Sequence, residues 1–495
     1  MGRADKYNIN NSYLNEISIE DTDEKSFGKV PSMKIRIDHQ SIISGAKPET
    51  LAEIRRRLTF PNQAWLENER RGFSNYKTPA LLECFEPSPG GLSFPRGFTG
   101  QACRIAKRYG EDVTVVDNRR EFPDVDFHFI GTLKPFQQDA VNDVLAKPFG
   151  TLQAPTGSGK TVMALALIAA RKQPALIVVH TKELLHQWIE RIETFTGIPK
   201  TEIGIIGGGK MQIGNKISVA LVQSLCKCAD DVFEYIGFLI VDECHRCPSK
   251  TFLDVVTAFD CKYMLGLSAT PWRRDRLTRL IWFYLGDKVH EVNGQHLFDE
   301  GHICRAVVET IETDFRTDID GSTEYSRMLS ELCLDPERNE LVALHTCHEA
   351  NGSIGISLVL SDRKSHCGAL QAAMLSNGID TDVLTGDTTS KDRTALTDKL
   401  RAGKVRVLVA TGQLIGEGFD LPEITSVILA TPIKFSGRLI QYIGRALRPS
   451  PGKDHARIID FMDSRVGVLA AGARSRLRIF TGMPGITIAA ELMLE

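Results

Sequence analysis

A glycine-rich turn between a predicted strand and a predicted helix carries the clearest chemistry in the sequence. Residues 150–154 (GTLQA) are predicted to form a short strand, and a helical pattern follows from Val162. Glycines at this spacing let successive backbone N–H groups point at phosphate oxygens, and the N-terminus of the helix adds a favourable partial charge. Lys160 is expected to reach the β- and γ-phosphates of ATP, and the Thr161 hydroxyl to bind Mg²⁺. The nucleotide-binding residues of this turn are Pro155, Thr156, Gly157, Ser158, Gly159, Lys160 and Thr161.

Two adjacent carboxylates follow an apolar run farther along the chain. Residues 238–241 read FLIV, and Asp242 and Glu243 come directly after them. Because a strand of this kind ends at the carboxyl edge of a parallel sheet, the two acids are expected near the glycine-rich turn. Asp242 is suited to hold Mg²⁺, and Glu243 to act as the base that orients the attacking water. The sequence therefore predicts an ATP-hydrolysing site with Mg²⁺ as the metal.

Apolar strands alternate with helical stretches after Gly131, which indicates parallel sheets covered on both faces. A polar, helical-looking stretch at about 312–350 separates two such series. Before Gly131, short alternating segments surround one helical run, which indicates a small α+β domain. The fold class is therefore α/β, with two tandem parallel-sheet domains and a small N-terminal α+β domain. The predicted boundaries are a mobile tail at 1–30, the N-terminal domain at 31–130, the first α/β domain at 131–311, a helical bridge at 312–350 and the second α/β domain at 351–495.

Composition limits the class of protein but does not identify a substrate. The chain has 495 residues, a net charge of −2, and eleven cysteines without a repeated metal-ligand spacing, so we expect free thiols in a reducing compartment. Neither an apolar leader nor a run of 18 apolar residues is present, which predicts a cytoplasmic protein without a membrane partner. Residues 31–120 hold fifteen Lys/Arg against ten Asp/Glu, which suits either a phosphate-binding module or a solvated helix face.

The order of the motifs over about residues 131–463 resembles the superfamily 2 helicases of the DEAD/DEAH type. Asp242 to His245 is similar to the DEAD/DEAH box, and 441–448 (QYIGRALR) to the QxxGRxxR motif. The resemblance implies two RecA-like domains, with arginine fingers on the second that complete the ATP site of the first. It implies adenine recognition by Gln137, further nucleotide contacts by Gly416 and Asp420, coupling by His245, Ser268, Ala269 and Thr270, and catalytic roles for Gln441, Arg445 and Arg448 alongside Lys160, Asp242 and Glu243.

The same resemblance implies nucleic-acid contacts on both α/β domains. Small hydroxyl and amide groups suit this task because they bind phosphate or sugar without reading bases, although each could instead be a helix cap or a turn residue. The implied contacts are Thr181, Gln223, Ser224, Arg363, Thr385, Gly386 and Thr411. On the N-terminal domain the candidate phosphate contacts are Arg70, Arg71 and Arg96, with a purely structural turn at 95–97 as the alternative.

A narrower likeness rests on residues 59–72 (TFPNQAWLENERRG) and on the PRG and GLSATPWRRD segments. These are similar to bacteriophage-type branch-migration helicases and to excision-repair helicases. The resemblance implies a monomeric DNA helicase or translocase that acts on forked, four-way or R-loop DNA with 3′–5′ polarity, alongside replication or recombination proteins. It would lie in the cytoplasm, at the nucleoid or in the host cell of a virus. An RNA helicase, a duplex-DNA translocase of a restriction or defence system, and a non-catalytic DNA-binding scaffold remain open, and removing residues 1–125 is expected to spare the basal ATPase activity.

Overall fold

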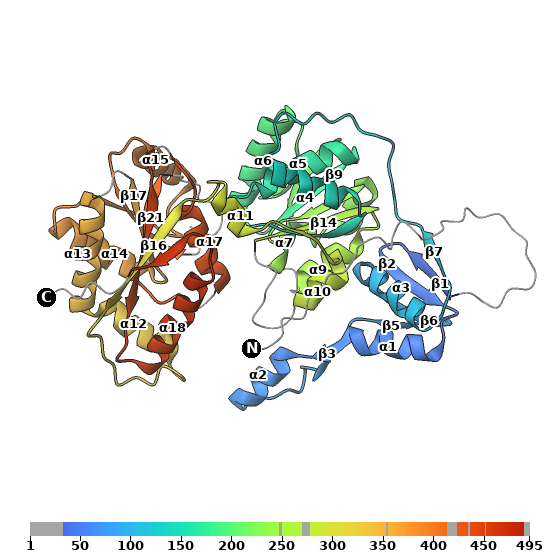
Figure 1. Cartoon of the computed structure of the whole chain (residues 1–495), viewed down its shortest axis with the longest axis horizontal. Helices are drawn as coiled ribbons and strands as arrows, with labels where there is room; N and C mark the ends of the chain where they lie inside the picture. The colour runs from blue at the N-terminus through green and yellow to red at the C-terminus, as the bar shows by residue number, and fades with distance from the viewer. Residues whose placement is uncertain are drawn as a thin grey trace, which may run out of the picture. The chain divides into compact units, whose positions relative to one another are not determined.

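Three sheets of five or more strands and one two-stranded sheet organise the described part of the chain (Figure 1). The computed structural model describes residues 33–246, 250–269, 278–352, 355–412, 423–433, 436–450 and 452–489, and the predicted tail at 1–30 lies outside them. Two compact units divide the chain: the first holds the chain up to Gln153 and Thr161–Glu291, and the second holds Ala154–Lys160 and the chain from Val292. Within the described ranges, no helix combines the length and apolar character that a membrane crossing needs.

The N-terminal sheet has five strands in the order β5-β6-β2-β1-β7. Every second residue of β1 is buried, as expected for a strand with one face on a core. Its strands are β1 (Met33–Ile37), β2 (Gln40–Ser44), β5 (Glu86–Ser88), β6 (Gly91–Pro95) and β7 (Val113–Asp117). Helices α1 (Pro48–Leu58) and α3 (Thr99–Arg108) accompany it, and β3 (Thr59–Pro61), α2 (Gln63–Arg71) and β4 (Leu81–Glu83) form a separate extension.

The core of this N-terminal layer continues into the first α/β domain. Leu280 and Phe283 of α10 (Thr278–Leu285) belong to the same buried cluster as Phe98, and the Phe98 and Phe283 rings meet edge-on at 5.3 Å. A Cβ at Gly97 would lie 2.5 Å from the backbone nitrogen of Gly286, so no side chain fits between the two layers. The N-terminal layer therefore shares its hydrophobic core with α10 of the first α/β domain. Removing residues 1–125 would expose Leu280 and Phe283 to solvent, at a cost in stability. That the truncation spares the basal ATPase activity stays a prediction.

The first large sheet has eight strands in the order β11-β10-β12-β9-β13-β14-β8-β15. All neighbours are parallel except β10 and β11, which form a hairpin through Gly208 and Gly209 at φ +61° and +85°. Its strands are β8 (Phe149–Gln153), β9 (Ala175–Val179), β10 (Gly204–Gly207), β11 (Lys210–Gln212), β12 (Ile217–Leu221), β13 (Phe238–Val241), β14 (Tyr263–Ser268) and β15 (Lys288–Glu291). Its helices are α4 (Pro135–Leu145), α5 (Lys160–Arg171), α6 (Lys182–Thr196), α7 (Val222–Leu225), α8 (Ala229–Val232), α9 (Lys250–Ala258) and α10. Every residue of β9 and β13 is buried, as predicted for a parallel sheet covered on both faces.

The second large sheet has seven parallel strands in the order β18-β19-β17-β20-β21-β16-β22. Its strands are β16 (Arg305–Glu312), β17 (Ile356–Ser361), β18 (Thr381–Leu384), β19 (Val407–Thr411), β20 (Ile424–Leu429), β21 (His455–Met462) and β22 (Ile486–Ile488). The helices of this unit are α11 (Gly294–Asp299), α12 (Tyr325–Leu334), α13 (Pro336–Gly352), α14 (Lys364–Ser376), α15 (Ser390–Arg401), α17 (Ser436–Ala446) and α18 (Gly467–Thr481). The α/β fold class with two RecA-like domains is confirmed.

The predicted helical bridge at 312–350 is wrong, because this segment belongs to the second domain. Strand β16 pairs with β21 along its whole length, and Val342 and Ala343 of α13 are buried in one cluster with Val359 of β17. The buried side of α13 consists largely of small residues among charged ones, so its sequence resembles a polar helix. The second domain therefore begins before β16 and not at residue 351.

Candidate ATP site and nucleic-acid edges

Three neighbouring parallel strands bring the predicted ATP motifs to one edge of the first sheet. Strands β13, β14 and β8 lie side by side in this order. Asp242 and Glu243 follow β13, Ser268 ends β14, and the glycine-rich turn follows β8. Because parallel strands end at the same edge, the sheet alone accounts for the grouping of motifs that lie far apart in the sequence.

The turn between β8 and α5 has the conformation that phosphate binding needs. Gly157 and Gly159 adopt φ +89° and +83°, a region that only glycine enters at low cost. The backbone N–H and the hydroxyl of Ser158 both donate to the Pro155 carbonyl, at 3.2 and 2.8 Å. Lys160 begins α5, and its ammonium donates to the Ala154 carbonyl at 2.9 Å. The turn therefore presents backbone N–H groups, one cation and a helix N-terminus together.

Asp242 is nearly buried and is fixed by two hydrogen bonds. The residue is 8% exposed. The indole Nε1–H of Trp188, on α6, donates to Oδ2 at 2.9 Å, and the backbone N–H of Glu243 donates to Oδ1 at 2.9 Å. Both of these donors are neutral groups. Sequence reasoning missed Trp188, because nothing in its surroundings along the chain links it to a residue 54 positions away.

Glu243 and His245 connect the acidic motif to the end of β14. Glu243 adopts φ +49°, which is strained for a residue with a side chain and is characteristic of functional sites. Its Oε2 lies 3.3 Å from Nδ1 of His245, and the same Nδ1 lies 3.2 Å from Oγ of Ser268. The structure thus brings three predicted residues into one polar chain of carboxylate, imidazole and hydroxyl. Ala269 follows directly, and Thr270 lies outside the described residues.

The oxygen groups at this edge fit a magnesium ion. Mg²⁺ takes hard oxygen ligands and usually needs only one or two from the protein, because phosphate and water supply the others. The Asp242 carboxylate and the hydroxyl of Thr161, in the first turn of α5, are groups of this kind. In the part of the chain that the structure describes, no group of three or more His, Cys, Asp or Glu residues forms a closed metal site.

Gln137 lies in the first turn of α4, which precedes β8. Pro135 opens the helix, and Oε1 of Gln137 accepts from the backbone N–H of Lys134 at 3.0 Å. The residue is 6% exposed, so its carboxamide is held in one orientation. Adenine recognition by Gln137 stays a proposal.

The predicted arginine motif lies on α17 and the turn that follows it. Gln441 and Arg445 are on the helix, although the description does not extend to their side chains, and Arg448 follows the helix and is half-buried. The ammonium of Lys453 donates to the carbonyls of Ile424 at 2.6 Å and Arg448 at 3.0 Å, and to that of Ala446. These bonds hold the backbone at Arg448 in place. Burial lowers the pKa of Lys453. Gly416 and Asp420 lie outside the described residues.

The loop 154–160 is grouped with this second unit, and two glycines show how closely it packs there. A Cβ at Gly444 would lie 2.7 Å from Cβ of Thr156, and a Cβ at Gly157 would lie 3.9 Å from Cγ of Arg448. A side chain at position 444 would therefore clash with Thr156 of this loop.

The predicted nucleic-acid residues of the first α/β domain share the carboxyl edge with the ATP motifs. Thr181 follows β9 and caps α6, accepting from the backbone N–H of Leu184 at 3.3 Å. Gln223 and Ser224 lie on α7 directly after β12, the neighbour of β9. The cap explains Thr181 structurally, and its contact with nucleic acid stays a proposal.

The corresponding residues of the second domain follow three adjacent strands. Strands β18, β19 and β17 are neighbours, and Thr385 with Gly386, Thr411 and Arg363 stand at or after their carboxyl ends. The guanidinium of Arg363 donates to Oγ of Ser326 at 2.7 Å. The sheet therefore gathers hydroxyl groups, backbone and a cation along one edge.

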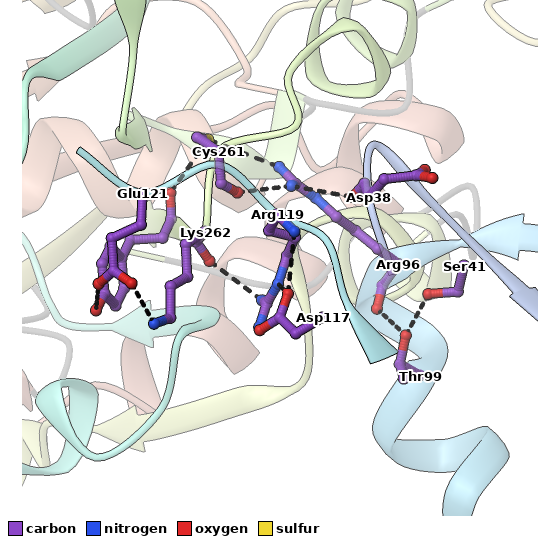
Figure 2. A network of polar contacts seen from close by, with 10 residues as sticks. Asp38, Ser41, Arg96, Thr99, Asp117, Arg119, Glu121, Cys261 and Lys262 are labelled. Atoms are coloured by element: carbon purple, nitrogen blue, oxygen red, sulfur yellow. Dashed lines mark hydrogen bonds and ion pairs between the residues drawn. The ribbon is translucent and has the colours of Figure 1, made fainter. Parts of the chain in front are cut away.

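Arg96 is not a surface residue, and its prediction as a phosphate contact is wrong. It is 2% exposed, and its guanidinium donates to the Cys261 carbonyl at 2.7 Å and to Sδ of Met264 at 3.3 Å. Burial lowers its pKa. Figure 2 shows Arg96 entering this network beside the ion pair of Arg119 and Asp117 at 2.6 Å. Arg96 instead joins the N-terminal layer to the first α/β domain. This agrees with the alternative that residues 95–97 have a purely structural role.

Arg70 and Arg71 are exposed, unlike Arg96. They end α2, and none of residues 63–71 is buried. Arg71 has only a loose ion pair with Glu67, at 3.9 Å.

Comparison with known proteins gives two family matches that cover both α/β domains. Residues 130–273 match the family described as "Type III restriction enzyme, res subunit", and residues 338–450 match "Helicase conserved C-terminal domain". A protein of Acanthamoeba polyphaga mimivirus, named as an ATP-dependent RNA helicase, is 28% identical over 400 residues, covering 77% of this chain and 75% of its own length. The "DNA 3'-5' translocase XPB2" of Sulfurisphaera tokodaii is 28% identical over 355 residues, covering 64% of this chain and 78% of its own length.

Solved structures show the same fold. A fragment of an HsdR subunit of a type I restriction enzyme from Vibrio vulnificus superposes with a TM-score of 0.54 at 19% identity, over 73% of this chain and 68% of the fragment. At this identity the likeness concerns the fold alone.

Proposed function

Because the chain belongs to the superfamily 2 helicases and is an ATP-hydrolysing enzyme, we propose that it is a DNA helicase or translocase. Its substrates would be forked, four-way or R-loop DNA, which it would unwind or branch-migrate with 3′–5′ polarity. The observation that carries the proposal is the polar chain from Glu243 through His245 to Ser268, because it links a catalytic carboxylate to a neighbouring strand end. The translocase from Sulfurisphaera tokodaii, named for DNA and for this polarity, supports the substrate class.

The residues of the first sheet edge would carry out the hydrolysis. The glycine-rich turn and Lys160 would hold the β- and γ-phosphates, with Thr161 and Asp242 as ligands of Mg²⁺. The metal supplies positive charge that neutralises the phosphate oxygens as the bond to the leaving group breaks. Glu243 would accept a proton from the attacking water and orient it. Gln441, Arg445 and Arg448 would complete the site from the second domain, so that turnover depends on domain closure.

The link from Glu243 to Ser268 would couple ATP to movement. His245 contacts both residues. A change in the charge or position of the Glu243 carboxylate would therefore shift His245 and, through it, Ser268 at the end of β14. Ser268, Ala269 and Thr270 would pass this change to the rest of the domain. Nucleotide release would reverse it.

Nucleic acid would bind along the edges of both sheets without sequence readout. The candidate residues offer hydroxyl, amide and backbone groups, which contact phosphate and sugar and leave the bases unread. A motor that moves along DNA needs contacts of this kind, since every step presents a new sequence. The contacts would be made by Thr181, Gln223, Ser224, Arg363, Thr385, Gly386 and Thr411, with Arg70 and Arg71 on the N-terminal layer.

The decisive experiment compares the ATPase rate with four separate cofactors: single-stranded DNA, blunt duplex DNA, a four-way junction and RNA. Strong stimulation by the junction, together with strand displacement or branch migration, supports the proposal. Preferential stimulation by RNA would replace the DNA substrate with RNA, as the name of the mimivirus relative suggests. Stimulation by blunt duplex without unwinding would point to a duplex translocase, and no stimulation at all would overturn the motor assignment.

A further inference from the structure

An arm formed by residues 59–83 extends from the N-terminal sheet and has almost no core of its own. It consists of the β3–β4 ribbon and α2, which stand away from the sheet in Figure 1. Phe60 is buried in the N-terminal core and anchors the arm, whereas none of residues 63–71 of α2 is buried. Hydrophobic burial therefore fixes only the base of the arm.

Side-chain amides hold the rest of the arm in shape. Asn62 caps α2 through the backbone N–H of Ala64 at 3.1 Å, and its own amide donates to the Pro79 carbonyl at 2.8 Å. The amide of Asn68 donates to Oδ1 of Asn75 at 3.0 Å. The amide of Asn75 in turn donates to the carbonyl of Trp65 at 3.2 Å. These bonds tie the loop after α2 back to the helix, so the loop has a defined conformation despite its exposure.

The loop presents apolar side chains to solvent. Phe73 is 62% exposed, Tyr76 92% and Leu81 50%. Among the large hydrophobic residues that the structure describes, Tyr76 is the most exposed. A rigid loop that displays two aromatic rings offers stacking surfaces at little cost in conformational entropy, because the rings have few rotamers to lose.

The charge of the same loop indicates what would stack there. Residues 70–81 (RRGFSNYKTPAL), which we call the tip, contain Arg70, Arg71 and Lys77 but no Asp or Glu. Cations at the end of a helix also complement its dipole, which accounts for the two arginines but not for the exposed rings. Aromatic rings interleaved with cations are the combination that binds unpaired nucleic acid, with rings on the bases and cations on the phosphates.

We propose that the tip binds an unpaired strand, with Tyr76 and Phe73 stacked on its bases and Arg70, Arg71 and Lys77 on its phosphates. This inference rests on the proposed function, since it assigns the single-stranded part of a forked substrate to the arm. It adds base stacking by aromatic residues to a region for which only phosphate contacts were expected.

The test measures DNA affinity of the full-length protein by fluorescence anisotropy. The probes are a labelled fork with unpaired arms and a blunt duplex of the same length, and the variants are Tyr76→Ala, Phe73→Ala and the double substitution. Loss of each stacked ring is expected to weaken fork binding about tenfold, while blunt-duplex binding changes less than about twofold. Tyr76→Trp should restore fork binding, because a larger ring stacks at least as well. Tyr235→Ala, which removes a tyrosine that is 56% exposed elsewhere in the first unit, is the matched control and should bind the fork like the wild type.

Salt dependence separates the two kinds of contact. Replacing Arg70 or Arg71 by Ala should reduce the slope of log affinity against log salt by about one per lost phosphate contact, whereas the aromatic substitutions should leave the slope unchanged. A thermal unfolding midpoint close to that of the wild type checks that each variant is folded.

Three results would overturn the inference. Equal losses on fork and duplex would show that the rings do not select unpaired bases, and failure of Tyr76→Trp to restore binding would exclude stacking. Unchanged fork affinity in the double variant would show that the rings of the tip do not bind DNA, and would favour a protein partner instead. If the wild-type ATPase is still stimulated by DNA in these cases, the proposed function stands and only the role of the arm fails.

Discussion

The carboxyl edges of the two large sheets hold carboxylates that accept hydrogen bonds from different kinds of donor. At the first edge, Asp242 accepts hydrogen bonds from two neutral donors, the indole Nε1–H of Trp188 and the backbone N–H of Glu243. At the second, Asp463 follows β21 and is paired with the buried guanidinium of Arg338 at 2.7 Å. Asp460, within β21, is likewise paired with Arg476 at 2.8 Å. The same sheet architecture therefore places a carboxylate beside neutral donors at one edge and in buried ion pairs with arginine at the other.

The largest effect is expected from Glu243→Gln at the first edge. The amide keeps the shape of the side chain but cannot accept the proton of the attacking water, so kcat of the ATPase should fall about 10³- to 10⁴-fold. ATP binding, measured by equilibrium titration, should stay near that of the wild type. Lys160→Ala is the contrasting variant and should lose nucleotide binding. Wild-type turnover in both variants would refute the site.

Arg448→Ala tests whether the second domain contributes to hydrolysis. Loss of a cation that stabilises the transferred phosphoryl group should lower kcat about 10³-fold and change ATP affinity far less. Arg465→Ala is the control, because Arg465 lies in the same unit and pairs with Asp314. A change in ATP affinity as large as the change in kcat would indicate a binding role.

Arg338→Met tests the structural role of the second edge. It leaves the buried Asp463 carboxylate without its cation, which should lower the free energy of unfolding by about 3 kcal/mol or more. Denaturant unfolding measures this change. In contrast with Glu243→Gln, ATP turnover per folded molecule should be retained, and its loss at unchanged stability would contradict the comparison.

Trp188→Phe tests the neutral donor at the first edge. The ring still fills the core, but Oδ2 of Asp242 loses its hydrogen bond, a change of about 1–3 kcal/mol in buried sites. We expect the Mg²⁺ concentration for half-maximal ATPase activity to rise about tenfold, with a smaller change in kcat. Trp282→Phe, on α10, is the control. An unchanged Mg²⁺ dependence would show that Trp188 only packs.

The last prediction concerns His366 and the dependence of stability on pH. Its ring lies between Oγ of Ser361 at 2.9 Å and Oδ1 of Asn339 at 2.8 Å, and burial, with Arg338 nearby, lowers its pKa from 6.5 to about 3. The unfolded state therefore takes up this proton first, so the stabilisation is complete above about pH 6.5 and is lost progressively toward pH 3. His366→Gln should flatten the dependence of unfolding free energy on pH in this range. Parallel curves for the two proteins would show that His366 does not titrate as proposed.

Sequence reasoning found the ATP motifs because they are local. The glycine-rich turn and the acid pair each follow a predicted strand, and alternation of strands and helices is enough to place their ends at one sheet edge. The start of the second domain was harder to predict from the sequence. The buried face of α13 is made largely of small residues, and the pairing of β16 with β21 joins segments about 150 positions apart. The predicted boundary at 351 failed for this reason.

The arginines of the N-terminal layer show what sequence alone cannot decide. Arg70, Arg71 and Arg96 have the same side chain, and all three were expected to contact phosphate. Arg96 is buried and donates to the carbonyl of Cys261, 165 positions later, whereas Arg70 lies on a helix in which no residue is buried by the described part of the chain. The sequence by itself determined the α/β class, the ATP motifs and their order, because backbone periodicity and motif spacing are properties of short segments. Only the tertiary structure decided which cations face solvent and which carboxylates pair with a buried guanidinium, because burial and electrostatic pairing depend on what packs against a residue from elsewhere in the chain.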